Sequence, residues 1–294
     1  ATTEKVNGSY NSKGAEYCTL SQPEFTITQN EHIIHLNWEP VKNAEGYYIL
    51  NKNDKGEWSV YQRITAGTDF SLYVWQTHEK LQLTVQAYRG DRVSDFKEDV
   101  AVIDYWAKAN AEYAIYTDAI YFTDYSGRYN TTYNLYRKLA TQSDDEYKLI
   151  SSDIAGSSGE WVYLSDDTDV EYDTEYVYQV RMSYLGVEQQ SNIQTINIIK
   201  YSPEKYIDSF DVTTKKENDN YVFYFDGTKK NEAKSFKESV YVNSTTFWAN
   251  TQSTEKWVFD DWSYDIDNLR FGYVLSDEKG STPIDGFVVD KSIK

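Results

Sequence analysis

The sequence predicts an all-β protein built of tandem immunoglobulin-like β-sandwiches. Apolar and polar residues alternate with period two over many short segments, which is typical of strands with one buried face. Aromatic residues make up 16% of the chain, with 28 Tyr among them, and these residue types favour strands. Clusters of Gly, Asn, Asp and Pro separate the segments. This spacing is typical of sandwiches and leaves little room for long helices.

The first predicted sandwich covers residues 22–103. Phe25 and Ile27 alternate with threonines, and a second segment carries Ile34, Leu36 and Trp38 on alternate positions. Pro40 should end this second strand, because proline cannot donate a ladder hydrogen bond. Further strand-like segments lie at 47–49, 58–61, 81–87 and 100–102. These segments approach the count of about seven strands that a single sandwich needs.

Two short patterns give this region a family resemblance. Trp38 stands two residues before Pro40, and Gly46 opens the next segment before a pair of tyrosines. In this arrangement residues 22–103 resemble a fibronectin type III module, whose second strand carries a core Trp before Pro and whose third begins near Gly-Tyr. The resemblance implies that Trp38 is a core residue.

Residues 104–200 are similar to the same family in a looser way. Residues 133–138 resemble its third strand, and residues 173–180 resemble its sixth, where the family places a tyrosine that bonds back to the chain. Tyr176 is the corresponding residue. The departures are Leu81, where the first module would carry this tyrosine, and Ile-Tyr-Phe at 120–122, where the second would carry its Trp.

The remaining segments complete a predicted division into four parts. Residues 1–21 are polar without a sustained period and predict an N-terminal arm. Residues 101–121 permit a helical turn or two, but the surrounding pattern favours a linker followed by a strand. Residues 201–294 predict a third β-sandwich, immunoglobulin-like or carbohydrate-module-like. Its strand-like segments lie at 221–225, 240–242, 257–259, 269–273 and 287–289.

Composition excludes several classes of partner. The chain has 29 Lys and Arg against 47 Asp and Glu, a net charge of −18 that repels nucleic-acid phosphates. No apolar run approaches the roughly 18 residues of a membrane span. One Cys and three His predict no internal disulfide and no Cys/His metal site. We expect a monomer without a cofactor, located outside the cell or on a bacterial cell surface.

Catalytic chemistry finds little support in the sequence. Nucleophilic catalysis needs a nucleophile, a base and an orienting group, yet the three histidines are His32, His35 and His78, and Cys18 lies in the polar arm. A pair of carboxylates could serve a glycosidase, but 47 acidic residues make chance pairs common. The sequence therefore predicts a protein that is not an enzyme.

A glycan-binding surface is the sharper hypothesis. Asp260 and Asp261 are framed by Trp257 and Trp262, and Trp248 lies nearby in the sequence. A sugar ring can stack its CH groups on a flat aromatic face while carboxylates bind its hydroxyls. The alternative interpretation is a core Trp257 followed by a solvated acidic turn, because large aromatic residues in strands are usually buried.

Two weaker candidate sites accompany this surface. Trp58 and Trp161 each follow a loop, where a ring either covers a sheet edge or binds a ligand. Asp166, Asp167 and Asp169 could supply oxygen ligands to Ca²⁺, but the segment lacks the Gly and terminal Glu of an EF-hand loop. A charged sheet edge explains these carboxylates without any metal.

The function predicted from these observations is that of a non-catalytic extracellular or cell-surface binding module. Its predicted partner is a polysaccharide, held by exposed aromatic residues. The alternative is a protein-binding adhesin, or a rigid spacer or scaffold segment of a larger surface protein. Fibronectin type III-like modules accompany polysaccharide-binding parts in bacterial surface proteins, but the fold alone specifies no ligand.

Overall fold

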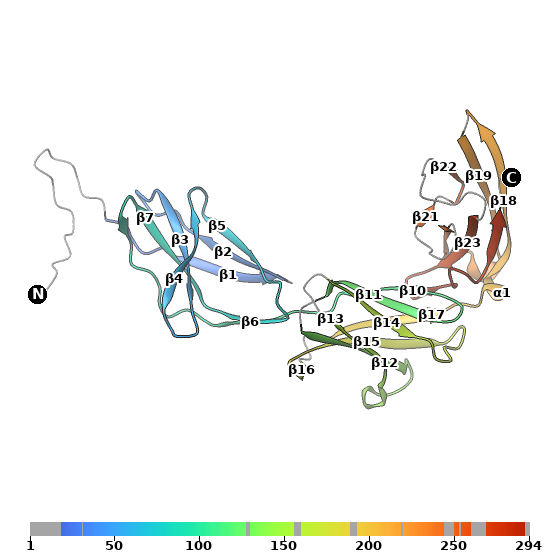
Figure 1. Cartoon of the computed structure of the whole chain (residues 1–294), viewed down its shortest axis with the longest axis horizontal. Coiled ribbons are helices and arrows are strands. Elements are labelled where there is room, and N and C mark those ends of the chain that lie inside the picture. The colour runs from blue at the N-terminus through green and yellow to red at the C-terminus, as the bar shows by residue number, and fades with distance from the viewer. Residues whose placement is uncertain are drawn as a thin grey trace, which may run out of the picture. The chain divides into compact units, whose positions relative to one another are not determined.

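The computed structural model describes residues 19–30, 32–127, 130–155, 160–188, 193–218, 220–243, 250–252, 254–259 and 269–291. Within these residues the regular structure is almost entirely β, so the predicted fold class is confirmed (Figure 1). The chain divides into two compact units, Ala1–Lys108 and Ala109–Lys294.

The first unit is a β-sandwich of two antiparallel sheets. One has the strand order β1-β2-β5, at Phe25–Asn30, Ile33–Trp38 and Asp69–Tyr73. The other has the order β4-β3-β7-β8, at Trp58–Ile64, Gly46–Lys52, Leu83–Arg89 and Arg92–Val93. A separate antiparallel pair joins β6 (His78–Leu81) to β9 (Ile103–Trp106). Three strands facing four is the arrangement of a fibronectin type III-like sandwich.

Trp38 lies in the core of this sandwich, as the sequence predicts. Its side chain is 5% exposed and meets the Tyr47 ring edge-on, with ring centroids 5.1 Å apart. The Tyr47 hydroxyl reaches the surface end of the core and accepts a hydrogen bond of 2.9 Å from the Val41 backbone N–H. A tyrosine in such a core can thus bury its ring and still satisfy its oxygen.

The second unit begins with another sandwich of three strands facing four. Its three-stranded sheet has the order β10-β11-β14, at Glu112–Ile115, Ile120–Gly127 and Glu160–Asp166. The facing strands have the order β13-β12-β15-β17, at Lys148–Ala155, Thr131–Leu139, Glu175–Tyr184 and Gln194–Lys200, with β16 (Val187–Glu188) beside β15. The segment 101–121 supplies two strands, β9 and β10, and the start of β11, where the sequence predicts a linker followed by one strand.

The rest of the second unit is also β. After the short helix α1 (Pro203–Tyr206), one sheet has the order β18-β19-β22, at Ile207–Glu217, Asn220–Lys229 and Lys256–Phe259. The other strands are β20, β21, β23, β24 and β25, at Lys237–Asn243, Asn250–Gln252, Leu269–Ser276, Gly280–Ser281 and Val288–Lys291. Every strand-like segment predicted beyond residue 200 overlaps one of these strands.

A parallel strand pair joins the two halves of the second unit. β17 runs parallel to β24, so that their two sheets form one ten-stranded sheet. The Ile199 N–H donates to the Lys279 carbonyl at 2.9 Å, and the Tyr201 N–H donates to the Ser281 carbonyl at 3.0 Å. A Cβ on Gly280 would lie 1.9 Å from the Ile199 carbonyl oxygen, so this close approach requires glycine.

Side chains reinforce the same junction. The Asp285 carboxylate accepts from the Thr117 backbone N–H at 2.7 Å and from the Thr117 hydroxyl at 2.8 Å. The buried Lys200 ammonium donates to the Thr117 carbonyl at 2.6 Å. Burial lowers the pKa of Lys200. The sequence boundary at residue 200 thus falls inside one compact unit, and the division into three domains stays a prediction.

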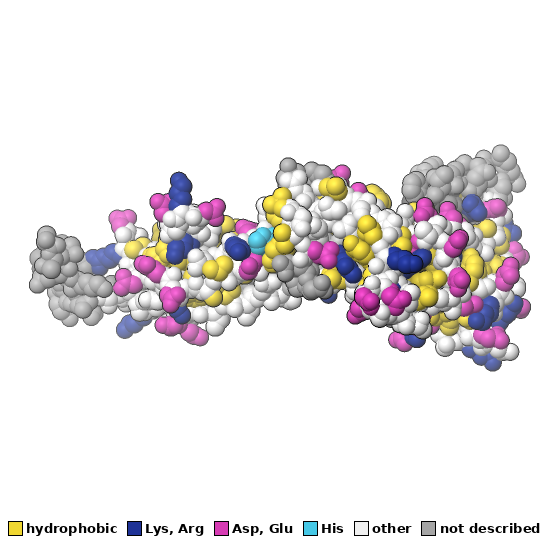
Figure 2. All heavy atoms as spheres, turned by 90° about the horizontal axis from the view of Figure 1, so that it is seen from below, with side chains coloured by type: hydrophobic (Ala, Val, Ile, Leu, Met, Phe, Trp, Pro, Cys, Tyr) yellow, Lys and Arg dark blue, Asp and Glu magenta, His cyan; other side chains and the backbone are white. Residues whose placement is uncertain are grey.

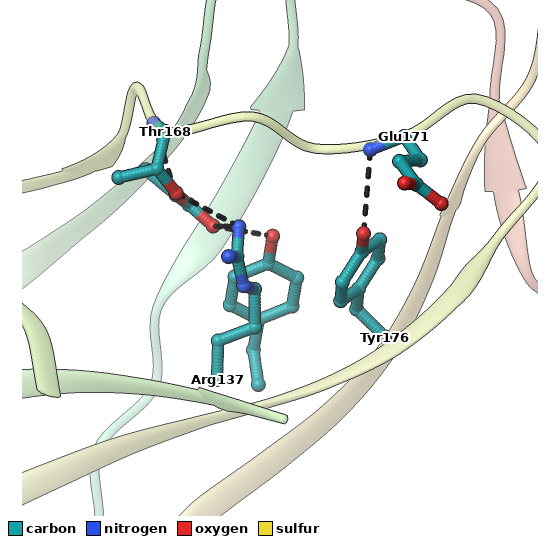
Figure 3. Close-up of polar contacts among 6 residues, drawn as sticks. Arg137, Thr168, Glu171 and Tyr176 are labelled. Atoms are coloured by element: carbon teal, nitrogen blue, oxygen red, sulfur yellow. Dashed lines mark hydrogen bonds and ion pairs between the residues drawn. The ribbon is translucent and has the colours of Figure 1, made fainter. Parts of the chain in front are cut away.

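A buried carboxylate organises one end of the 109–200 sandwich (Figure 3). Asp166 is fully buried and accepts from the Arg137 guanidinium at 2.7 Å, from the Tyr178 hydroxyl at 2.7 Å and from the Thr168 hydroxyl at 2.6 Å. Burial, and then the adjacent Asp166 charge, raise the pKa of Tyr178. The phenol therefore stays protonated and able to donate.

The tyrosine predicted to bond back to the chain does so. Tyr176 is buried on β15, and its hydroxyl accepts from the Glu171 backbone N–H at 3.3 Å (Figure 3). The Arg137 guanidinium lies 4.9 Å from the centre of the same ring. Because Arg137 contacts both Tyr176 and Asp166, it links the Tyr176 ring to the buried carboxylate.

We expect Asp166→Asn to lower the free energy of unfolding by about 3 kcal/mol, because Arg137 would keep its charge without a carboxylate to neutralise it. Urea unfolding followed by intrinsic fluorescence measures this loss. Asp167→Asn is the matched control, since Asp167 is the exposed neighbour. Equal stability of the two variants would contradict the role of Asp166.

We expect Gly280→Val to separate β24 from β17, at a cost of about 1–3 kcal/mol for overpacking. Trypsin should then cleave faster after Lys200, which is buried in the native chain. Mass spectrometry of a timed digest identifies the cut. Glu278→Ala, an exposed change in the same loop, should leave the rate unchanged. An unaltered cleavage rate in Gly280→Val would contradict this account of the junction.

Candidate functional site

Four of the exposed aromatic side chains among the described residues form two neighbouring pairs. Tyr73 and Trp75 follow one another on alternate positions at the end of β5, and Trp161 and Tyr163 do the same on β14. We call these the first and the second aromatic pair. Tyr73, Trp161 and Tyr163 lie on strands of three-stranded sheets, whereas Trp75 lies just beyond the end of β5. All four side chains are exposed.

The first aromatic pair presents two nearly parallel ring faces. The side chains of Tyr73 and Trp75 are 50% and 66% exposed, their ring centroids lie 6.1 Å apart, and their planes differ by 18°. The Val74 N–H donates to the His32 carbonyl at 2.8 Å, which continues the β5–β2 pairing past the end of the strand. The His32 ring lies 5.8 Å from Tyr73 and 6.2 Å from Trp75.

Polar side chains cover the same sheet face next to this pair. Thr28, His35 and Ser71 stand opposite one another on β1, β2 and β5, and His35 Nδ1 lies 2.9 Å from the Ser71 hydroxyl. The next row is Thr26, Asn37 and Asp69. A flat surface therefore combines stacking rings with hydroxyl, imidazole, amide and carboxylate groups.

The second aromatic pair has similar geometry. The side chains of Trp161 and Tyr163 are 48% and 62% exposed, with ring centroids 6.3 Å apart and planes that differ by 25°. The Tyr163 N–H donates to the Asp153 carboxylate at 2.9 Å, and the Ser165 N–H donates to the Ser151 hydroxyl at 3.2 Å. Two side chains of β13 thus accept hydrogen bonds from backbone N–H groups on the outer edge of β14.

The predicted platform at residues 248–262 is described only at Trp257. This side chain is 8% exposed, stacks on Phe223 at 5.5 Å and meets Phe259 edge-on at 5.5 Å. Trp257 is therefore a core residue, as the alternative interpretation of the segment had it, and its ring face is covered. The other four residues, Trp248, Asp260, Asp261 and Trp262, lie outside the described residues.

The two secondary tryptophans differ in their surroundings. Trp161 is exposed in the second aromatic pair, whereas Trp58 is half-buried and meets the Phe96 ring edge-on at 5.6 Å. The Lys52 ammonium also lies 5.6 Å from the Trp58 ring centre. Trp58 is on β4 of a four-stranded sheet and Trp161 is on β14 of a three-stranded sheet, so their positions are not equivalent.

The suggested calcium ligands are not arranged around a common centre. Asp166 is buried and accepts bonds from Arg137, whose charge would repel a cation, while Asp167 and Asp169 are exposed. Across the described ranges, no group of three or more His, Cys, Asp or Glu side chains is placed to hold a metal ion. The buried Asp166 carboxylate is instead held by hydrogen bonds from Arg137, Thr168 and Tyr178.

A histidine–carboxylate contact joins a side chain of β6 to one of β9. His78 Nε2 lies 2.8 Å from the Asp104 carboxylate, and the His78 ring stacks on Trp106 with centroids 4.0 Å apart. This hydrogen bond lowers the pKa of Asp104. The contact joins the two strands on the surface of the first unit.

The residues predicted from the sequence include Trp161 but not Tyr73, Trp75 or Tyr163. A usable signal was present in the alternation itself. Residues 72–75 read Leu-Tyr-Val-Trp, and residues 161–164 read Trp-Val-Tyr-Leu. Because the aliphatic residues of each segment share one face, a core on that face directs both aromatic residues outward.

No protein-family model matches the chain, and no curated protein matches it. The chain is similar to a solved segment of two fibronectin type III domains from chicken tenascin, with 12% identity, coverage of 62% of this chain and 100% of that chain, and a TM-score of 0.38.

A second similar structure is the FN1–FN3 domain segment of chicken CNTN1, with 12% identity, coverage of 93% and 98%, and a TM-score of 0.29. Among the residues that the structure describes, no helix is long and apolar enough to cross a membrane. Three strands facing four, the core Trp38 and the bonded Tyr176 give the sandwich of the first unit and the first sandwich of the second unit their fibronectin type III-like character.

Proposed function

We propose that this chain is a non-catalytic module, located outside the cell or on its surface, that binds a polysaccharide through the first aromatic pair. The observation that carries the proposal is the presentation of Tyr73 and Trp75, whose ring planes differ by 18° while both side chains are at least half exposed. Large aromatic surfaces that remain in water in a folded chain commonly serve recognition.

The chemistry of a sugar fits this surface. Apolar CH groups on one face of a pyranose ring can pack against an aromatic ring, which removes apolar area from water. The hydroxyl groups at the sugar's rim need hydrogen-bond partners, and His35, Asn37 and Asp69 offer both donors and acceptors on the same sheet face. Tyr and Trp lose little side-chain entropy on binding, because each has two rotatable bonds.

Charge favours a neutral polysaccharide over an acidic one. The chain has a net charge of −18, and the face drawn in Figure 2 carries acidic side chains on both units, among basic and hydrophobic ones. A polymer of uronic acids or sulfated sugars would be repelled by this field. A neutral polymer pays no such electrostatic cost.

A rigid spacer is the second candidate function, and the junction in the second unit favours it. The parallel pairing of β17 with β24 and the bonds between Thr117 and Asp285 join the two halves of that unit by backbone and side chain together. Adjacent modules without such contacts are expected to move relative to one another. The two functions are compatible, since a spacer can also carry a binding face.

We expect Trp75→Ala to weaken polysaccharide binding by roughly tenfold, the effect of losing about 1.4 kcal/mol of stacking. Affinity electrophoresis measures it, in gels that contain starch, hydroxyethylcellulose, galactomannan or xylan. Val102→Ala is the matched control, since Val102 is an exposed apolar residue of the same unit outside the aromatic pair. Unchanged mobility of the wild-type chain in every gel would refute glycan binding and leave the spacer.

A further inference from the structure

We propose that the polysaccharide of the proposed function continues from the first aromatic pair over the polar residues of the same sheet, and that this sheet selects an extended, unbranched, neutral chain of several sugars. The inference rests on the proposed function and concerns the first unit alone. The surface has two rows of residues that stand opposite one another on β1, β2 and β5, and we call these six residues the polar face: Thr28, His35 and Ser71, then Thr26, Asn37 and Asp69.

The polar face begins where the first aromatic pair ends. Tyr73, Ser71 and Asp69 occupy alternate positions of β5, so their side chains project from the same side of the sheet. A path across the strands from Tyr73 would instead meet the aliphatic Ile33 on β2. The hydrogen-bonding groups therefore follow the strands, and we place the sugar chain along that direction.

Several members of the polar face have hydrogen-bonding groups to offer. The Asn37 amide, the Thr28 hydroxyl and the Asp69 carboxylate form no hydrogen bond to another described residue. His35 uses its Nδ1 atom toward the Ser71 hydroxyl, at 2.9 Å, which leaves the Nε2 atom for a ligand. Because sugar hydroxyls both donate and accept, they can replace water at these groups.

Short side chains keep this surface open. Charged residues make up 26% of the chain, but the polar face holds only the carboxylate of Asp69, without any Lys, Arg or Glu. Elsewhere, long charged side chains cover an outward ring. The Lys215 and Lys256 ammonium groups lie 4.9 and 5.9 Å from the centre of the Tyr224 ring. The Tyr224 hydroxyl also donates to Glu217. The polar face carries no such long side chains, and its short ones lose less entropy when a ligand binds.

The surface is long enough for several sugars. Trp75 and Asp69 are six residues apart. At about 3.4 Å per residue, an extended strand covers about 20 Å between them, roughly the length of four linked pyranose rings. An extended chain can follow a flat face over this distance, whereas a coiled chain bends away from it and a heavily branched chain is lifted off. Asp69 would repel acidic sugars, so the chain is neutral.

The test separates the polar face from the first aromatic pair by ligand length. The probes are cellobiose and cellohexaose, with the corresponding mannan and xylan oligosaccharides, and NMR titration measures their affinities for the isotope-labelled chain. A disaccharide can cover the aromatic pair, but only a hexasaccharide also reaches Asn37. We expect Asn37→Ala to lower the hexasaccharide affinity about three- to tenfold, the effect of one lost hydrogen bond, and to leave the disaccharide affinity unchanged. Trp75→Ala should weaken both.

A second variant blocks the same path without relying on one hydrogen bond. Asn37→Lys would lay a long side chain across the polar face, and we expect it to weaken the hexasaccharide alone, by about tenfold or more. Gln62→Ala and Gln62→Lys are the matched controls, because Gln62 is an exposed amide on β4 of the other sheet and its variants change the charge equally. Urea unfolding midpoints equal to that of the wild type establish that each variant is folded.

The outcomes distinguish this inference from the proposed function. If Trp75→Ala weakens binding while both Asn37 variants bind the hexasaccharide as the wild type does, the polar face is refuted and the proposed function stands. If the wild type binds neither an oligosaccharide nor a polysaccharide, both proposals fail. Retention by starch, whose chains coil, or by the polyuronate alginate, in place of these hexasaccharides, would overturn the inferred ligand class.

Discussion

The structure depends on the strict alternation of side chains along its strands. In β2, Ile34, Leu36 and Trp38 enter the core while His35 and Asn37 point away from it. A shift of the register by one residue would exchange these two sets and place a histidine and an asparagine in the core. The same alternation determines which residues of each outer sheet face are available to a ligand, so stability and recognition share one constraint.

Tyrosine allows these cores to be built from a rather polar sequence. Tyr178 and Tyr273 have buried rings, and their hydroxyls donate to the carboxylates of Asp166 and Glu238 at 2.7 Å. Burial, followed by these carboxylates, raises the pKa of both phenols, which remain protonated donors. Each ring contributes apolar area, and each hydroxyl neutralises the desolvation cost of a carboxylate near the edge of the core.

The second unit shows how two sandwiches can share a sheet. Its junction combines a parallel strand pair, a glycine at the point of closest approach and a carboxylate that binds a backbone N–H and a hydroxyl on the other half. At the same place the buried Lys200 ammonium adds a hydrogen bond to the Thr117 carbonyl. The two halves of this unit are therefore held together by backbone and side-chain hydrogen bonds at once.

The sequence by itself determined the all-β class, the course of most strands, the burial of Trp38 and the bonded position of Tyr176. These features depend on local alternation and on residues a few positions apart, which a sequence displays directly. Tertiary structure alone decided that Trp257 is covered while Tyr73 and Trp75 are exposed, and that Asp285 meets Thr117 from 168 positions away. Alternation states which residues share a face, but only the packing of a second sheet decides which face is buried.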